Sequence, residues 1–146
     1  MDIAVQFEDW TQALSDIDMI ARQAIAQILA ELKAPQLGEL SIALVSDLDI
    51  QILNRDFRQK DKPTNVLSFP DAGPAPLLGD IVLGLETITR EATEKSISVE
   101  HHVTHLMVHG TLHLLGFDHT RDADAVLMEG LEVEILGKLD IPNPYS

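Results

Sequence analysis

The spacing of three histidines constrains this chain more than any other feature of its sequence. His109, His113 and His119 follow the pattern H-x3-H-x5-H within residues 98–119, a stretch that holds all six histidines. Residues four apart lie on one face of a helix, with Cβ atoms about 5–6 Å apart. Two such imidazoles can bind one metal ion at about 2.0–2.1 Å each. The segment is therefore predicted to form a helix that presents His109 and His113 to one ion.

Gly116 predicts the end of this helix, because glycine readily adopts the left-handed conformation found at helix C-termini. The chain can then reverse, so that His119 on the following loop approaches the same ion. Three imidazoles leave one tetrahedral position open, as in catalytic sites where the metal lowers the pKa of a bound water to about 7. Zinc is the leading metal, although copper, nickel or iron also suit imidazole ligands. A helix that is merely rich in histidine is the alternative.

The spacing H-x3-H-x2-G-x2-H is shared with the metzincin proteases. Those enzymes carry glutamate as general base directly after the first histidine, where this sequence has Gly110. A zinc hydrolase of the metzincin-like type, acting on peptides or small molecules, is therefore an alternative that Gly110 opposes.

Length and composition predict a single domain inside the cell. The 146 residues fit one domain, residues 1–146. The chain has no cysteine, which excludes disulfides and thiolate metal sites and agrees with a reducing cytosol. No uninterrupted apolar stretch approaches the ~18 residues of a membrane span. We therefore expect a cytoplasmic protein that does not contact a membrane.

The net charge of −14 argues against a general affinity for nucleic acid, because phosphate contacts come from Lys and Arg. The basic residues are not spread evenly, however. Four of the ten lie within the basic segment, residues 55–62: Arg55, Arg58, Lys60 and Lys62. Exposed charges are largely screened beyond about 10 Å, so this segment can bind phosphate despite the acidic remainder. A solvated helix end is the alternative.

Hydrophobic periodicity predicts an α+β fold. Alternating or continuous apolar residues indicate four strands, at about residues 2–7, 40–45, 66–69 and 80–85. Helical spacing indicates about five helices, at about residues 16–33, 47–57, 87–95, the histidine helix and 122–139. We expect a roughly four-stranded mixed sheet with the histidine helix across one of its faces.

Several single residues carry further expectations. Asp122 is expected to cap the N-terminus of the last helix. The residues of this helix expected to pack inward are Val126, Leu127, Leu131, Ile135 and Leu136, and Met128 is expected to fill the core. Those expected to face mostly outward are Glu129, Glu132 and Glu134. Phe57, Phe69 and Phe117 are expected in the core or in pocket walls, with stacking on bases as the alternative. Thr64, Asn65 and Ser68 are expected to cap turns, with phosphate binding as the alternative.

Other polar residues are candidates for hydrogen bonds to a metal ligand. His105 lies one turn before His109 and is expected to be buried and hydrogen-bonded, with contact to a ligand imidazole as the alternative. Asp80 is expected to hold a ligand imidazole or to pair with the basic segment. Asp118 is expected either to hold a ligand or to face solvent.

Three blocks of the sequence resemble one family. The string V-H-G-T-L-H-L-L-G-F-D-H at residues 108–119 is similar to the signature H-G-x-L-H-L-x-G-[YF]-D-H of the YbeY family of bacterial rRNA maturation endoribonucleases. The string N-R-D-F-R-Q-K-D-K-P-T-N-V-L-S-F-P at residues 54–70 resembles the family pattern of an arginine before K-D-x-P-T-[DN]-V-L-S-F. The third block is L-G-D-I at residues 78–81. Together they cover a little under a quarter of the chain.

The resemblance implies a zinc-dependent, single-strand-specific endoribonuclease that matures the 3′ end of 16S rRNA and takes part in ribosome quality control. In this family His109, His113 and His119 fall on the zinc ligands, with one zinc per chain, and Arg58 on the catalytic arginine. The zinc-bound water or hydroxide is then a candidate nucleophile, or a base that activates one. The implied partners are single-stranded RNA and the small ribosomal subunit, with ribosomal proteins or GTPases as candidates. A non-catalytic, ribosome-associated zinc protein is the alternative.

Overall fold

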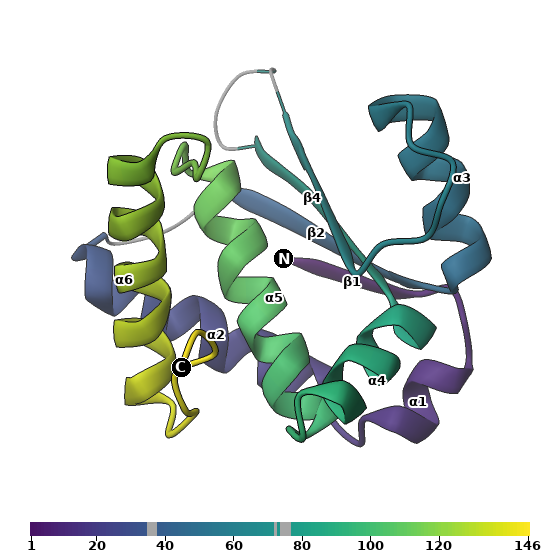
Figure 1. The fold of residues 1–146 in the computed structure, drawn as a ribbon, viewed down its shortest axis with the longest axis horizontal. Helices are drawn as coiled ribbons and strands as arrows, with labels where there is room; N and C mark the ends of the chain where they lie inside the picture. The colour runs from purple at the N-terminus through teal and green to yellow at the C-terminus, as the bar shows by residue number, and fades with distance from the viewer. Residues whose placement is uncertain (35–37, 72, 74–76) are drawn as a thin grey trace.

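The computed structural model describes residues 1–34, 38–71, 73 and 77–146 and has an α+β fold (Figure 1). Its four strands are β1 (Asp2–Val5), β2 (Glu39–Val45), β3 (Val66–Pro70) and β4 (Leu77–Gly84). They form one sheet in the order β1-β2-β4-β3, in which β1, β2 and β4 are parallel and β3 is antiparallel to β4. The predicted mixed sheet of four strands is confirmed.

The helices are α1 (Asp9–Ala13), α2 (Ile17–Leu32), α3 (Asp47–Arg58), α4 (Leu85–Glu94), α5 (Val99–Leu114) and α6 (Asp122–Lys138). The sequence predicts all but α1, whose five residues are too short for a helical period. Trp10 holds α1 in place, because its buried Nε1–H donates to the carbonyl oxygen of Val45 at 2.9 Å. No helix in the described part of the chain is long and apolar enough to cross a membrane.

β4 begins three residues earlier than the sequence predicts. The expected start was residue 80, whereas the strand runs from Leu77. Residues 77–79 are extended because they pair with both neighbouring strands: Gly79 is opposite Leu40 in β2 and Pro70 in β3. Tertiary pairing thus extends the strand into a stretch that reads as a loop from its glycine and proline content.

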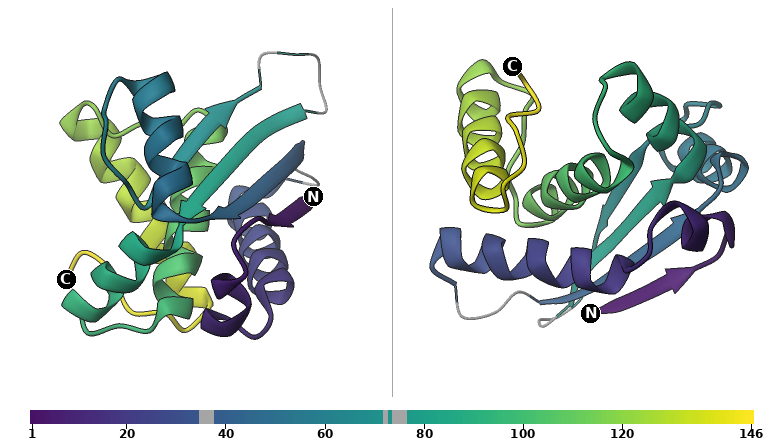
Figure 2. Two further views of the ribbon diagram at one scale, coloured as in Figure 1. Left: turned by 90° about the vertical axis from the view of Figure 1, so that its right-hand side faces the viewer. Right: turned by 90° about the horizontal axis from the view of Figure 1, so that it is seen from below.

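Helices cover both faces of the sheet (Figure 2). On one face Ile42, Leu44, Ile81 and Leu83 lie in the largest core cluster together with apolar residues of α1, α2, α4 and α5. On the other face Val45, Leu67 and Val82 pack against Ile50 and Leu53 of α3. Successive residues along β2, and along β4, point to opposite faces of the sheet, so each of these strands is buried on both sides. The histidine-bearing helix α5 lies on the first face, as expected.

α6 packs on α2 and α5. A second cluster of fully buried residues joins Ala24 and Ile28 of α2, Val108 and Leu112 of α5, and Met128, Ile135 and Leu136 of α6. The expectation that Met128 fills the core is therefore confirmed.

The prediction that two residues of α6 pack inward is wrong. Val126 and Leu127 are 73% and 57% exposed, whereas Glu132, expected outside, is 0% exposed. Arg121, not Asp122, is the N-cap, and it makes no side-chain cap hydrogen bond. The buried stripe of α6 is instead the row of Met128, Glu132 and Ile135, because that row faces α2 and α5.

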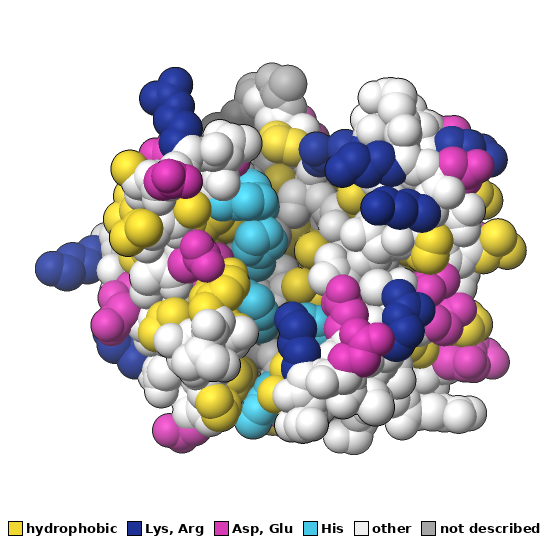
Figure 3. Space-filling model, in the orientation of Figure 1, with side chains coloured by type: hydrophobic (Ala, Val, Ile, Leu, Met, Phe, Trp, Pro, Cys, Tyr) yellow, Lys and Arg dark blue, Asp and Glu magenta, His cyan; other side chains and the backbone are white. Residues whose placement is uncertain are grey.

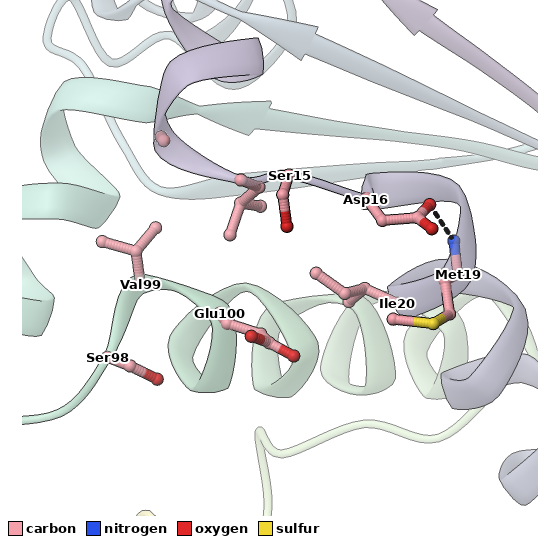
Figure 4. A pocket seen from close by; sticks show the side chains of 9 residues that line it. Ser15, Asp16, Met19, Ile20, Ser98, Val99 and Glu100 are labelled. Atoms are coloured by element: carbon pink, nitrogen blue, oxygen red, sulfur yellow. Dashed lines mark hydrogen bonds between the residues drawn. The ribbon is translucent and has the colours of Figure 1, made fainter.

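A cavity of about 350 Å³ lies where α2 and α5 begin (Figure 4). Its polar walls are used as helix caps: Asp16 accepts from the backbone N–H of Met19, and Ser98 accepts from that of His101. The cavity is at the N-terminal end of α5, and none of its lining residues belongs to the histidine group at the other end.

Candidate active site

The three histidines proposed as metal ligands lie together at the C-terminal end of α5. One ring nitrogen from each lies within 4.8 Å of the others. The ring centroids of His109 and His113 are 4.7 Å apart, those of His113 and His119 are 4.8 Å apart, and those of His109 and His119 are 5.4 Å apart. His119 is exposed and the other two are half-buried. The group could hold a metal ion and is open to solvent on one side.

Gly116 makes this convergence possible. α5 ends at Leu114, and Gly116 has a φ of 101°, in the region that favours glycine. The backbone N–H of Phe117 then donates to the carbonyl oxygen of Leu112 at 3.0 Å, which satisfies one of the carbonyl groups left free at the helix end. The chain turns back here, and His119 arrives beside His113.

The surroundings of His113 favour its neutral ring. Burial lowers the pKa of His113, and charge on His109 or His119 would lower it further. His113 is therefore neutral at ordinary pH, and a neutral imidazole is the form that coordinates a metal. In the space-filling view, histidine side chains form a row along a hollow in this face of the molecule (Figure 3).

Glu132 lies on α6 behind the histidines and was missed by the sequence analysis. Its Oε1 accepts from His105 Nε2 at 2.6 Å and lies 3.3 Å from His109 Nδ1. Burial would raise the pKa of Glu132, but these hydrogen bonds outweigh it and lower the pKa to about 2. His105 is buried and hydrogen-bonded, as expected. The four-residue step from Met128 to Glu132 was the available signal.

Arg58 lies in the last turn of α3, beside the strand that borders α5. Its Nη2 donates to the carbonyl oxygen of Ser68 at 2.8 Å, and its guanidinium carbon is 5.8 Å from the ring centroid of Phe69. Ser68 Oγ donates to the carbonyl oxygen of Gly110 at 3.4 Å. Because Gly110 directly follows His109, these contacts link Arg58 through Ser68 to the helix that carries the histidine group.

The basic segment is exposed at this place. Arg55 pairs with Asp56 at 3.0 Å, whereas Arg58, Lys60 and Lys62 form no ion pair with any residue that the structure describes. Lys and Arg side chains gather across the hollow from α6 (Figure 3). The segment therefore offers positive charge to a ligand near the histidines.

Phe57 is an exception to the expectation for the aromatic residues. Its side chain is 61% exposed, and its ring packs edge-on against that of Phe69, with centroids 5.4 Å apart. Phe57 lies two turns after Ile50 on the same face of α3, but in the last turn of the helix, where its ring meets the edge of Phe69 and stays largely exposed. The expectation of a core or pocket-wall position is wrong for Phe57, while Phe69 and Phe117 are partly buried against core clusters.

One family model matches the part of the chain that carries these site residues. A family model described as "Endoribonuclease YbeY" matches residues 4–140, a range that contains the three histidines, Glu132 and the basic segment. The chain belongs to the YbeY family of endoribonucleases.

Relatives in the YbeY family are similar over nearly the whole chain. The Endoribonuclease YbeY of Sphingopyxis alaskensis is 46% identical over an alignment that covers 94% of this chain and 89% of the relative. The Endoribonuclease YbeY of Azorhizobium caulinodans is 46% identical over an alignment that covers 100% of this chain and 96% of the relative. A solution structure of a Thermotoga maritima protein has a TM-score of 0.61 at 23% identity, over 96% of this chain and 92% of that one. That last likeness supports the fold alone.

Gly110 has a packing role in this YbeY-family chain. A Cβ built at this position would lie 3.0 Å from Ser68 Oγ and 3.2 Å from Cδ1 of Ile81. Ile81 is fully buried and has little freedom to move. α5 therefore approaches the sheet too closely for a glutamate at the position that metzincins use for their general base.

We expect Gly110→Ala to lower the free energy of unfolding by up to about 2 kcal/mol, because overpacking costs about 1–3 kcal/mol and helix propensity returns about 1. Gly130→Ala in α6 is the matched control, since a Cβ there meets nothing within 4 Å. That control should gain up to about 1 kcal/mol. Urea unfolding measures both, and equal gains would contradict the close approach of α5.

Asp118, Asn65 and Asp80 make no side-chain hydrogen bond to a ligand ring in the described part of the chain. Asp118 accepts from the backbone N–H of His119 at 2.6 Å and from Thr120 Oγ1 at 3.1 Å, and these bonds lower its pKa. Asp118 thus shapes the loop that carries His119. Asn65 donates to Glu91, which also meets His102 Nε2 at 2.9 Å. Asp80 is exposed on β4, and no side-chain hydrogen bond or ion pair joins it to another described residue.

Proposed function

We propose that this chain is a zinc-dependent endoribonuclease that cleaves single-stranded RNA, in the maturation of the 3′ end of 16S rRNA and in ribosome quality control. The observation that carries the proposal is the convergence of three imidazoles at a solvent-open point beside an exposed, basic segment. Membership in a family of endoribonucleases supports the reaction, and the donor set supports the metal.

His109, His113 and His119 would hold the metal ion. Three nitrogen ligands with an open fourth position suit catalytic zinc more than a structural site, which is closed by four protein ligands. When bound, zinc supplies a Lewis acid that offsets negative charge and lowers the pKa of water. The half-buried rings of His109 and His113 exclude solvent from one side, so that substrate approaches from the side of His119.

Arg58 would bind the phosphate that is cleaved. A guanidinium carries five N–H donors in a planar fork that matches two phosphate oxygens. The carbonyl oxygen of Ser68 takes one of these donors at 2.8 Å and orients the group, which leaves donors for the substrate. Negative charge grows on the phosphate oxygens as the bond breaks, and a pre-oriented cation stabilises that charge.

The RNA strand would lie over the basic segment. Single-stranded nucleic acid is bound by basic grooves together with aromatic rings that stack on bases. Phe57 directly precedes Arg58, is exposed and packs edge-on against Phe69, so it offers such a ring. Lys60 and Lys62 would contact phosphates further along the strand.

The acidic remainder of the surface shapes the choice of partner. With a net charge of −14, the chain would bind free RNA weakly, because few of its surfaces attract phosphate. We therefore place its action on the small ribosomal subunit, where ribosomal proteins or GTPases deliver the substrate. We also propose that residues 1–146 act as one domain in the cytoplasm.

Metal analysis combined with cleavage assays tests the proposal. The purified chain is expected to contain one zinc, to cleave single-stranded RNA and to leave double-stranded RNA and casein intact. A chelator should abolish RNA cleavage, and added zinc should restore it. Casein hydrolysis without RNA cleavage would instead support a metzincin-like hydrolase.

A further inference from the structure

The carboxylate of Glu132 is buried at the back of the histidine group, among the otherwise apolar buried residues of α6. Its side chain is 0% exposed. Its Oε2 is buried and has no hydrogen-bond partner among the described residues. A buried carboxylate with an unsatisfied oxygen lowers stability, so packing alone does not account for glutamate at this position.

Three side chains from different parts of the chain converge on the other oxygen. Glu132 Oε1 accepts from His105 Nε2 at 2.6 Å and from the Tyr145 hydroxyl at 2.8 Å, and it lies 3.3 Å from His109 Nδ1. Burial and the charge of Glu132 raise the pKa of Tyr145, so the phenol keeps its proton and donates. The carboxylate is thereby held in one orientation.

This orientation has a consequence for His109. An ionised carboxylate only accepts hydrogen bonds, so the Nδ1 atom that faces Glu132 must carry the proton of the neutral ring. The Nε2 atom then keeps its lone pair. The same ring lies against His113 and His119, with centroids 4.7 Å and 5.4 Å away.

We propose that Glu132, held by Tyr145 and His105, is a positioning residue that selects the Nδ1–H form of His109 and fixes its ring for metal binding. The inference rests on the proposed metal centre and adds residues that belong to α6 and to the C-terminal segment. Partners of this kind raise metal affinity by fixing both the orientation and the protonated nitrogen of a ligand.

A second cation is the competing use of these groups, because His105, His109 and Glu132 offer ligand atoms within 4.8 Å of one another. The separations of 2.6 Å and 2.8 Å on Glu132 Oε1 are those of charge-assisted hydrogen bonds. The Tyr145 hydroxyl donates to the same oxygen. Hydrogen bonds therefore explain why these side chains lie so close together, without a second metal ion.

The test is the zinc affinity of Glu132→Gln, measured by competition with a chromophoric chelator. Glutamine keeps an acceptor for His105 and Tyr145, but its amide can also donate to His109 Nδ1 and so favour the wrong ring form. We expect zinc affinity to fall about 10–100-fold, with an unchanged or raised melting temperature of the metal-free protein. Glu134→Gln, which removes the same charge from an exposed position on the same helix, should bind zinc like the wild type.

Nitrogen-15 NMR of the metal-free protein provides a readout that a purely structural role would not change. The wild type should show His109 protonated at Nδ1, and Glu132→Gln should show loss of that preference. Wild-type zinc affinity together with an unchanged His109 ring form in Glu132→Gln would overturn the proposal. So would a second bound zinc that Glu132→Gln alone removes.

Tyr145→Phe decides the matter if Glu132→Gln does not fold, since Tyr145 is 47% exposed and its hydroxyl is dispensable for packing. A smaller loss of zinc affinity supports the role, and an unchanged affinity contradicts it. His113→Ala separates this inference from the proposed metal centre. If wild type and His113→Ala bind zinc equally, the centre itself is wrong; if only His113→Ala loses zinc and Glu132→Gln does not, the positioning role alone is wrong.

Discussion

A His113→Ala protein is expected to lose its zinc and to cleave single-stranded RNA no faster than the chelator-treated wild type. His113 lies between the other two histidines, with ring centroids 4.7 Å and 4.8 Å away, so its loss leaves only two ligands. Loss of a hydrogen-bond partner outside the ligand set costs about 10–100-fold in affinity, and loss of a ligand should cost more. Elemental analysis and RNA cleavage measure the two effects.

His101→Ala is the matched control, because His101 lies about three turns earlier on α5 and its side chain makes no hydrogen bond or ion pair with a residue that the structure describes. This variant should keep zinc and activity. The melting temperature of both proteins shows whether the fold survives. Retention of zinc by His113→Ala would remove this histidine from the centre, and full ribosome-related function without zinc would favour a structural role for the metal.

The second large effect is expected for Arg58→Ala, which should slow RNA cleavage by about 10²–10³-fold, the usual cost of losing one pre-oriented donor to a developing oxyanion. Zinc content and melting temperature should stay at wild-type values, since the Arg58 side chain is exposed and makes a single hydrogen bond. Most of the loss should lie in kcat if Arg58 stabilises charge that grows during the reaction.

Two further variants sharpen this result. Arg58→Lys keeps the charge but not the fork of donors, so it should recover only part of the rate. Arg22→Ala removes an exposed cation of α2 that lies outside the basic segment and is already paired with Asp18 at 2.7 Å, and it should cleave RNA as fast as the wild type. Unchanged cleavage by Arg58→Ala would take this residue out of the mechanism.

Sequence reasoning succeeded where interactions are local. The pairing of His109 with His113 depends only on helical geometry, and the turn that brings His119 back depends on the positive φ of Gly116. Five of the six helices and all four strands follow from periodicity and capping residues within a few positions of each other. Motif spacing also indicated the YbeY family, and the family match confirmed it.

The tertiary structure decided what depends on contacts between distant segments. The burial of Glu132, the exposed ring of Phe57 and the shortage of space at Gly110 follow from how closely each part of a helix lies against the sheet or another helix. Glu132 lies four residues after Met128, which indicates that the two share a face of α6. α6 carries apolar residues around much of its circumference, however, so its sequence alone does not decide which face packs on α5. Local spacing thus determined the histidine group and the helix that carries it. The strand order, the contact from Arg58 to Ser68 and the hydrogen bonds behind His109 arise only when residues far apart in the chain compete for the same buried surface.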